Sequence, residues 1–250
     1  MNLRGKVAII TGAAAGIGAA TARLFARNGA ALALVDLDKK GLERVASECG
    51  ESGADVLSLK RDVSLIKEID RVFDETLGRF QGLDILINNA IYRAIRPCLE
   101  IEEQEFDQSL FTNIKGYFFM AQKAVPHMVR RGEGRIINMA STFGFVGSPN
   151  LSVYCTCKGA VINMTRAMAL ELAPKNIYVN AVAPGPIMTE GLEDLVKRMP
   201  SVYDARVQDT PMGRFGTPEE VAEVCLFLAS RECSYMNGSI LVTDGGFLTH

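Results

Sequence analysis

The chain has 250 residues, of which 48% are hydrophobic, and this size and composition predict one folded domain with a sizeable core rather than a disordered chain. Its formal net charge of −2 gives no electrostatic basis for binding nucleic acid. No apolar run approaches the ~18 residues of a membrane span, and the start leads straight into a predicted strand without signal-peptide features, so we expect a cytoplasmic protein without membrane contact.

Short β-branched and apolar runs alternate with longer helical patterns along the chain. The apolar runs predict strands buried on both faces at 6–11, 31–36, 55–62, 83–89, 135–140, 177–183 and 240–243. The helical patterns predict helices at 16–28, 39–49, 66–79, 102–131, 153–172 and 218–228. This alternation predicts a single α/β domain over 1–250, with a Rossmann-like, doubly wound parallel sheet of about seven strands and helices on both faces.

The stretch from Pro184 to Gly216 is the least regular part of the chain and is rich in Pro, Gly and Met. A long irregular segment in a compact domain more often has a function than serves as slack. We therefore expect residues 186–216 to form a substrate-binding lid, with a plain surface excursion as the alternative.

A glycine-rich turn joins the first predicted strand to the first predicted helix. It reads Thr11-Gly12-Ala13-Ala14-Ala15-Gly16-Ile17-Gly18. Glycines at this place let the backbone approach a pyrophosphate, which would lie at the positive end of the helix. The spacing differs from Gly-x-Gly-x-x-Gly, and no Gly-Lys-Ser/Thr follows as in phosphate-binding NTPases. The turn therefore predicts a dinucleotide site.

Asp36 ends the second predicted strand and indicates which dinucleotide binds. A carboxylate there would accept hydrogen bonds from the adenosine ribose and repel a 2′-phosphate. Residues 13–15 include no arginine or lysine, although Lys39 and Lys40 could reach back. We therefore predict NAD rather than NADP, with a helix N-cap as the alternative role of Asp36.

Tyr154 and Lys158 are four residues apart and so share one face of a predicted helix, with Ser141 thirteen residues before the tyrosine. A free phenol has a pKa of about 10, and a cation within ~4 Å would lower it. A phenol with a lowered pKa can exchange a proton with an alcohol or carbonyl oxygen. The pair is thus a candidate acid–base device.

Together these motifs resemble the short-chain dehydrogenase/reductase family over nearly the whole chain. The matching residues are the glycine-rich turn, Asp62-Val63, Asn88-Asn89-Ala90, Asn113, Ser141, Tyr154-x-x-x-Lys158, Pro184-Gly185 with Thr189, and Asp244-Gly245-Gly246. The resemblance implies an NAD(H)-dependent oxidoreductase that interconverts a secondary alcohol and a ketone by hydride transfer. It also implies a homotetramer.

The resemblance implies a role for each matched catalytic residue. Tyr154 would be the general acid/base, and Lys158 would lower its pKa and hold the nicotinamide ribose. Ser141 would hold the substrate oxygen, and Asn113 would hold a water that relays protons. The implied cofactor-binding residues are Gly12, Ala14, Ala15, Gly16, Ile17, Gly18, Asp36, Leu37, Asp62, Val63, Asn89, Ala90, Ile91, Tyr154, Lys158, Pro184, Gly185, Ile187 and Thr189.

One position departs from the family pattern, which usually reads Asn-Asn-Ala-Gly. Ile91 stands where that glycine would be. Glycine permits a positive φ and a close backbone approach, and a β-branched residue suits neither. We therefore expect a slightly reshaped site beside the nicotinamide ribose.

Substrate contacts are expected from the segment that follows Ser141 and from the lid. Ser141 itself is expected to contact the substrate oxygen. Phe143 in the first segment and Met199 and Tyr203 in the lid favour an apolar or mixed pocket, which suits steroids, cyclic alcohols or acyl ketones. Arg93 follows the asparagine motif and is suited to gripping a carboxylate, which favours a sugar acid or hydroxy acid. A surface or interface arginine is the alternative.

The cysteine and histidine content argues against two other function classes. The six cysteines form no Cys-x-x-Cys pair and only two histidines are present, which argues against a metal site and against a Ser-His-Asp hydrolase. The remaining alternative is a catalytically silent NAD(H)-binding regulatory protein on the same fold, because fold does not fix function.

Overall fold

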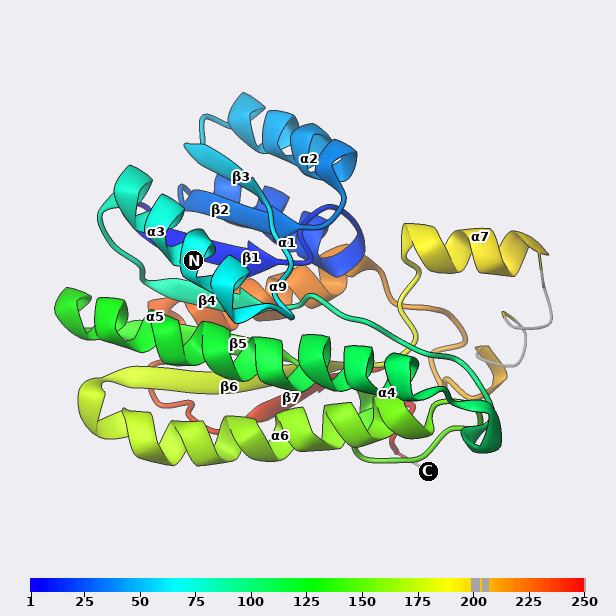
Figure 1. Cartoon of the computed structure of the whole chain (residues 1–250). Coiled ribbons are helices and arrows are strands. Elements are labelled where there is room, and N and C mark those ends of the chain that lie inside the picture. Colours follow the sequence, from blue (N-terminus) through cyan, green and yellow to red (C-terminus); the bar gives the residue numbers. More distant parts are fainter. Residues whose placement is uncertain (199–202, 204–206, 250) are drawn as a thin grey trace.

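A fully parallel, seven-stranded sheet forms the centre of the computed structural model, which describes residues 1–198, 203 and 207–249 (Figure 1). The strands are β1 (Val7–Thr11), β2 (Ala31–Asp36), β3 (Val56–Lys60), β4 (Ile85–Asn88), β5 (Gly134–Met139), β6 (Ile177–Pro184) and β7 (Ile240–Thr243). Their order is β3-β2-β1-β4-β5-β6-β7, so the winding reverses between β1 and β4. The predicted doubly wound sheet is confirmed, and ligands of such sheets bind at the carboxyl edge beside this reversal.

Helices cover both faces of the sheet, as predicted. They are α1 (Gly16–Arg27), α2 (Lys39–Glu51), α3 (Ile66–Phe80), α4 (Glu103–Leu110), α5 (Tyr117–Arg131), α6 (Ser152–Leu172), α7 (Glu190–Arg198) and α9 (Pro218–Ala229). One face packs against α1, α2 and α9, and the other packs against α3, α5 and α6 (Figure 1). No helix in the described part of the chain is both long enough and apolar enough to cross a membrane.

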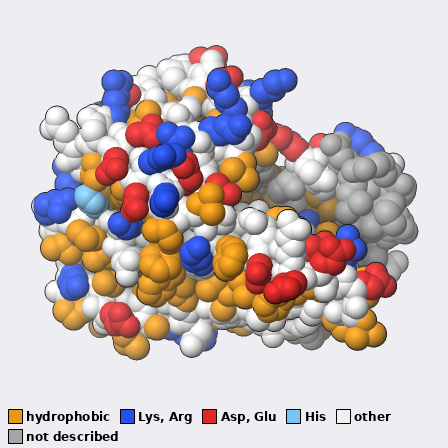
Figure 2. Space-filling model, viewed as in Figure 1, with side chains coloured by type: hydrophobic (Ala, Val, Ile, Leu, Met, Phe, Trp, Pro, Cys, Tyr) orange, Lys and Arg blue, Asp and Glu red, His pale blue; other side chains and the backbone are white. Residues whose placement is uncertain are grey.

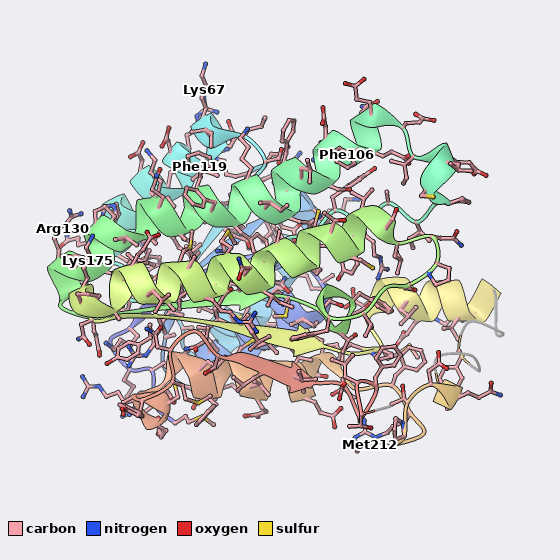
Figure 3. The ribbon with its side chains drawn as sticks, turned by 90° about the horizontal axis from the view of Figure 1, so that it is seen from below. Lys67, Phe106, Phe119, Arg130, Lys175 and Met212 are labelled. Carbon is pink, nitrogen blue, oxygen red and sulfur yellow. The ribbon has the colours of Figure 1, made fainter. Side chains whose placement is uncertain are left out.

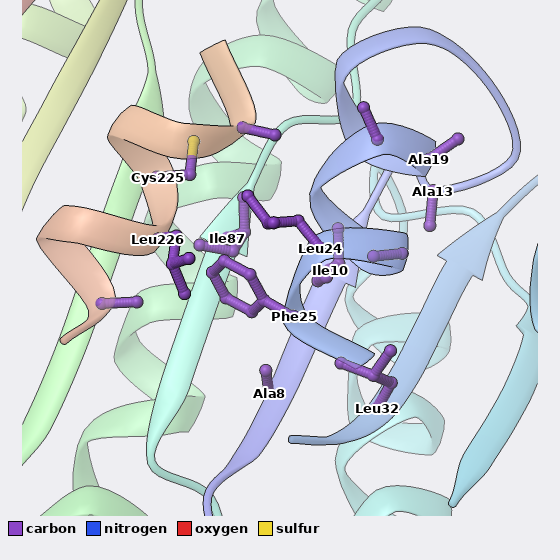
Figure 4. Close-up of a cluster of buried hydrophobic side chains, with 14 of the residues drawn as sticks. Ala8, Ile10, Ala13, Ala19, Leu24, Phe25, Leu32, Ile87, Cys225 and Leu226 are labelled. Carbon is purple, nitrogen blue, oxygen red and sulfur yellow. The ribbon is translucent and has the colours of Figure 1, made fainter. Parts of the chain in front are cut away.

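Phe25 shows how the core holds the glycine-rich turn in place. Its side chain is fully buried among Ile10, Ile87 and Leu226, which come from β1, β4 and α9 (Figure 4). Burial of such a side chain contributes roughly 1.5–3 kcal/mol relative to exposure. Because α1 is fixed against α9 and the sheet, its N-terminus is held at the carboxyl edge.

The start of α9 is fixed by two reciprocal hydrogen bonds between Thr217 and Glu220. The Thr217 hydroxyl accepts from the Glu220 backbone N–H at 3.2 Å, and the Glu220 carboxylate accepts from the Thr217 N–H at 2.8 Å. This is a capping box with Pro218 in the first turn. Arg214 pairs with the same carboxylate at 2.7 Å and so links the segment before α9 to the first turn of this helix.

Two details of the predicted elements are wrong. The single helix expected at 102–131 is divided, because residues Phe111–Gly116 form a π-helical segment between α4 and α5. The segment from Pro184 to Gly216 contains a helix, α7, which stands beyond the carboxyl ends of the strands (Figure 1). Met199, one of the expected lid residues, lies outside the described part of the chain.

Candidate active site

Ser141, Tyr154 and Lys158 meet at the carboxyl edge of the sheet. Ser141 lies two residues past the end of β5, while Tyr154 and Lys158 lie on one face of α6. The ammonium Nζ of Lys158 is 5.5 Å from the centroid of the Tyr154 ring and donates to the Met139 carbonyl at 2.6 Å. The tyrosine is 8% exposed and the lysine is 0% exposed, so a proton held between them is largely shielded from bulk water.

Burial decides the acid–base properties of both groups. It raises the pKa of Tyr154, while the Arg93 guanidinium and a hydrogen bond with Ser141 act to lower that pKa. Burial also lowers the pKa of Lys158 to about 7. The Tyr154 pKa is therefore raised rather than lowered as expected, because the loss of hydration outweighs the influence of Arg93 and Ser141, and Arg93 rather than Lys158 is the cation that opposes it.

Asn113 lies in the π-helical segment and is fully buried. Its amide nitrogen donates to the carbonyls of Tyr92 (2.7 Å) and Ser109 (2.9 Å), and its amide oxygen accepts from the Tyr92 N–H at 3.3 Å. These bonds tie the loop after β4 to the α4–α5 junction. π-Helical turns are frequent at functional sites, and this one orients Asn113 toward the loop that carries Arg93.

A cavity of about 420 Å³ opens over these residues. Of the predicted catalytic and substrate residues, it is lined by Arg93, Ser141, Phe143, Tyr154 and Lys158. Of the predicted cofactor residues, it is lined by Ile17, Asn89, Ile91, Pro184, Gly185, Ile187 and Thr189. The structure thus brings together the residues that were expected to surround the reacting atoms.

A second cavity of about 280 Å³ continues beside the glycine-rich turn. It is lined by Gly12, Ala15 and Gly16, and it shares Ile17 and Thr189 with the first cavity. The two cavities form one track from the N-terminus of α1 to Tyr154. An elongated ligand with a phosphate at the helix N-terminus fits this track.

The glycines of the turn are required by its geometry. Gly12 and Gly16 have φ of +65° and +52°. A Cβ on Gly12 would lie 2.8 Å from Asn89 Nδ2, and a Cβ on Gly18 would overlap the Gly12 carbonyl oxygen. The side chain of Asn89 locks the turn further by donating to the carbonyls of Thr11 and Gly12, each at 3.0 Å.

Thr11 connects the turn to the motif after β4. Its hydroxyl accepts from the backbone N–H groups of Asn89 (2.9 Å) and Ala90 (3.0 Å). Asn89 and Ala90 therefore shape the cofactor track by fixing backbone, although Ala90 lines neither cavity.

Asp36 reaches back from β2 to the glycine-rich turn. Its carboxylate accepts from the backbone N–H groups of Ala14 (3.0 Å), Leu37 (2.7 Å) and Asp38 (3.0 Å). The helix cap of α2 is Asp38, whose side chain accepts from the Lys40 N–H at 3.1 Å, so the N-cap alternative for Asp36 is wrong.

Three other predicted cofactor-binding residues, Leu37, Asp62 and Val63, follow β2 and β3. Leu37 is 59% exposed beside Asp36, as suits a residue that covers an adenine. Val63 is 6% exposed, and Asp62 uses one carboxylate oxygen to accept from the Ser64 N–H at 2.9 Å. The backbone carbonyl of Asp62 accepts from the Leu65 N–H at 3.2 Å.

Ile91 does not adopt a positive φ, so the backbone here does not depend on glycine. Its side chain is 47% exposed and lines both cavities. The change from the family pattern therefore narrows the track with an apolar side chain rather than straining the chain.

Of the predicted substrate residues, Phe143 lines the main cavity and Tyr203 does not. Phe143 lines the main cavity and packs edge-on against Phe247, with ring centroids 5.9 Å apart. Tyr203 does not line that cavity, which corrects its predicted place. Its ring stacks on Phe215, at 5.1 Å between centroids, and Phe215 lines the cavity in its stead.

Two residues beside the site were missed by sequence reasoning. Tyr117 is buried with its ring 5.3 Å from the Lys158 ammonium, and its spacing of four from Asn113 was the available signal. Arg44 on α2 donates to the Ala14 carbonyl at 3.1 Å and lies 3.5 Å from Glu190 of α7. No sequence signal placed Arg44 at the turn.

In the described part of the chain, no group of three or more His, Cys, Asp or Glu side chains is placed to hold a metal ion. The groups available for chemistry at the carboxyl edge of the sheet are therefore the acid–base side chains of Tyr154 and Lys158 and the two cavities beside them.

Comparison with known proteins places the chain among oxidoreductases. Residues 12–248 match a family described as enoyl-(acyl carrier protein) reductase. A 3-oxoacyl-(acyl-carrier-protein) reductase of Thermotoga maritima is 39% identical over 99% of this chain and 100% of its own. A short-chain type dehydrogenase/reductase from Mycobacterium marinum superposes with a TM-score of 0.93 at 38% identity, covering 100% of this chain and 98% of that one. An NAD+-bound xylitol dehydrogenase superposes with a TM-score of 0.93 at 33% identity, over 98% of this chain and 100% of that one.

Proposed function

Because this chain belongs to the short-chain dehydrogenase/reductase family, we propose that it is an NAD(H)-dependent oxidoreductase that interconverts a secondary alcohol and a ketone. The observation that carries the proposal is the convergence of Ser141, Tyr154 and Lys158 in a cavity that continues to the glycine-rich turn. The turn, the helix N-terminus and Asp36 suit a dinucleotide without a 2′-phosphate. When bound, the nicotinamide would supply the hydride chemistry.

The side chains of the cavity have complementary tasks in this proposal. In the oxidation, the phenol oxygen of Tyr154 would accept the proton of the substrate alcohol. In the reduction, the Tyr154 hydroxyl would donate its proton to the ketone oxygen. The Ser141 hydroxyl would donate to the same substrate oxygen and stabilise charge that develops on it. The Arg93 guanidinium lies 5.9 Å from the tyrosine ring centroid and favours the ionised form of the phenol.

The direct test is a screen for NAD reduction with cyclic alcohols, steroids, hydroxy acids and sugar acids. We expect turnover of at least one secondary alcohol, and reduction of the matching ketone with NADH. Tight NADH binding without turnover of any alcohol or ketone would favour the alternative of a silent regulatory protein.

Asp36 is expected to make the protein prefer NAD to NADP. A carboxylate about 4 Å from a phosphate charge costs roughly 1–4 kcal/mol between effective dielectrics of ~80 and ~20, which corresponds to a preference of about fivefold to a thousandfold in kcat/KM. Arg44 would not reverse this, because it is already paired with Glu48 at 3.3 Å and with Glu190.

The matched variants are Asp36→Asn and Asp70→Asn, which remove the same charge. Asp70 lies on α3, where it pairs with Lys123 at 2.5 Å. Asp36→Asn should narrow the ratio of kcat/KM for NAD over NADP by at least roughly tenfold, and Asp70→Asn should leave it unchanged. A wild-type preference for NADP would contradict the NAD assignment.

We also propose that the chain assembles as a homotetramer through the α4–α5 and α6 faces. Phe106, Phe111 and Phe118 are each more than 40% exposed along α4–α5, and Leu170 on α6 is 80% exposed. Hydrophobic side chains gather on this part of the surface in Figure 2, and Figure 3 shows α4–α5 lying beside α6. Exposed apolar patches of this kind mark interaction surfaces.

Light scattering coupled to gel filtration is expected to give a mass four times that of the 27.2 kDa chain. Phe111→Asp should lower this mass, because a charge would be buried in the contact. Lys67→Asp, on the exposed surface of α3, is the control and should not change it. A monomer at micromolar concentration would contradict the assembly.

A further inference from the structure

Arg93 lines the main cavity and has no acidic partner among the residues that the structure describes. It lies in the loop between β4 and α4, and its Cζ is 5.9 Å from the centroid of the Tyr154 ring. No described residue forms an ion pair or hydrogen bond with it, whereas its neighbour Arg96 pairs with Glu105 at 2.9 Å. Arg93 is exposed, but its guanidinium lies over the buried ring that is proposed to move the proton.

The charge of the cavity is one-sided. Among the described residues that line it, Arg93 and Lys158 are cationic and none is acidic. A concave site with one sign of charge concentrates ligands of the other sign. Several other residues that line the cavity are apolar, including Ile95, Pro149 and Leu151, and Asn150 adds a neutral polar group. An anionic group on a short aliphatic chain fits these surroundings.

The anion that Arg93 meets would belong to the substrate rather than to the dinucleotide. The phosphates of a dinucleotide are expected at the glycine-rich turn, beside the second cavity, and Arg93 does not line that cavity. The acidic residue at the edge of that cavity, Glu190, faces Arg44.

Resting on the proposed function, we propose that the substrate is a short hydroxy acid, or the corresponding oxo acid, whose carboxylate pairs with Arg93 while its hydroxyl lies between Ser141 and Tyr154. The planar guanidinium can hold both carboxylate oxygens and so fixes the orientation of the carbinol carbon. In the oxidation, the O–H proton goes to Tyr154, the C–H hydrogen leaves with its electron pair to the nicotinamide of NAD, and the C–O bond becomes a carbonyl.

A carboxylate on Arg93 has a second, measurable consequence. Arg93 acts to lower the pKa of Tyr154, and pairing with an anion would weaken this influence. Because kcat reports the ionisation of the enzyme–substrate complex, the rise of kcat with pH should lie at higher pH for a hydroxy acid than for its neutral ester.

The experiment compares 2-hydroxybutanoate, 3-hydroxybutanoate and 4-hydroxypentanoate with their methyl esters, using NAD and the full-length protein. For the preferred acid, Arg93→Ala should lower the ratio of kcat/KM for acid over ester by roughly tenfold to a hundredfold, as expected for loss of charge-assisted hydrogen bonds. Arg93→Lys should restore part of that ratio. Arg96→Ala, outside the cavity, is the control and should leave it unchanged.

The outcomes separate this proposal from the proposed function. If wild type oxidises neutral alcohols or esters and Arg93→Ala affects acids and esters alike, carboxylate recognition is overturned while the oxidoreductase assignment stands. If wild type oxidises none of the acids, esters or other alcohols, both proposals are overturned. If the acid-to-ester ratio falls only in the Arg93 variants, the carboxylate site is supported.

Discussion

Replacing Tyr154 with phenylalanine is expected to lower kcat by about 10²–10⁴-fold, the usual contribution of a positioned general acid or base. The substitution removes only the phenol oxygen. The ring that packs beneath Arg93 and beside Lys158 is retained. The fold should therefore be unchanged, and the affinity for NADH should stay within a few-fold of wild type. Steady-state kinetics with the best alcohol found in the screen, together with a fluorescence titration of NADH, measures both quantities.

Tyr178→Phe is the matched control. Tyr178 lies on β6, where its ring stacks on Arg135 with the guanidinium carbon 3.9 Å from the ring centroid, and it lines neither cavity of the cofactor track. Loss of its hydroxyl should leave kcat unchanged. Turnover by Tyr154→Phe within about twofold of wild type would show that another group moves the proton.

The pH dependence of wild type follows from the direction of the tyrosine pKa. Oxidation needs the deprotonated phenol, and burial raises the pKa of Tyr154. The rate of oxidation should therefore rise as pH increases through the alkaline range, and reduction, which needs the protonated phenol, should be favoured on the acid side. Tyr154→Phe should lose this dependence.

The fold could be predicted because the hydrophobic pattern of the strands indicates that helices cover both faces of the sheet. Runs such as Val7–Thr11 and Ala31–Asp36 are apolar at nearly every position, and only a strand covered on both faces needs that pattern. The π-helical segment at Phe111–Gly116 could not be predicted, since the same apolar spacing serves a regular helix. Its cause is tertiary, because Asn113 bonds to Tyr92 across the loop.

The site could be predicted only where chemistry follows local spacing. Tyr154 and Lys158 share a face because a helix brings positions four apart together. The direction of the tyrosine pKa depends on how many neighbours exclude water, and those neighbours come from distant strands and loops. For the same reason, the position of Arg93 over the ring and of Arg44 at the turn became visible only in the fold.

Lys158→Met is expected to make the protein more stable and much less active. Lys158 is fully buried, and its pKa falls from 10.5 to about 7. Below pH 7 both the folded and the unfolded chain hold this proton, and the folded state bears the full cost of burying the charge. As pH rises from 7 to 10.5 the unfolded chain alone stays protonated, so this cost declines and the stability of wild type rises. Methionine carries no such cost.

The gain in the free energy of unfolding should be roughly 2–4 kcal/mol near pH 6 and should shrink toward pH 10.5. It is partly offset by loss of the 2.6 Å bond from the ammonium to the Met139 carbonyl. Urea titrations of wild type and variant at several pH values, without added cofactor, measure the difference directly. Turnover should fall by at least about tenfold, because the side chain expected to hold the nicotinamide ribose beside Tyr154 is lost.

Lys67→Met provides the control for loss of a lysine charge, because Lys67 projects into solvent from α3 (Figure 3). Lys67→Met should change neither the free energy of unfolding nor the dependence of that free energy on pH. A Lys158→Met protein that is less stable at every pH would mean that the buried ammonium is fully compensated by its surroundings. A pH-dependent gain with loss of turnover would instead show that the fold tolerates an unfavourable buried charge at this position because catalysis needs it.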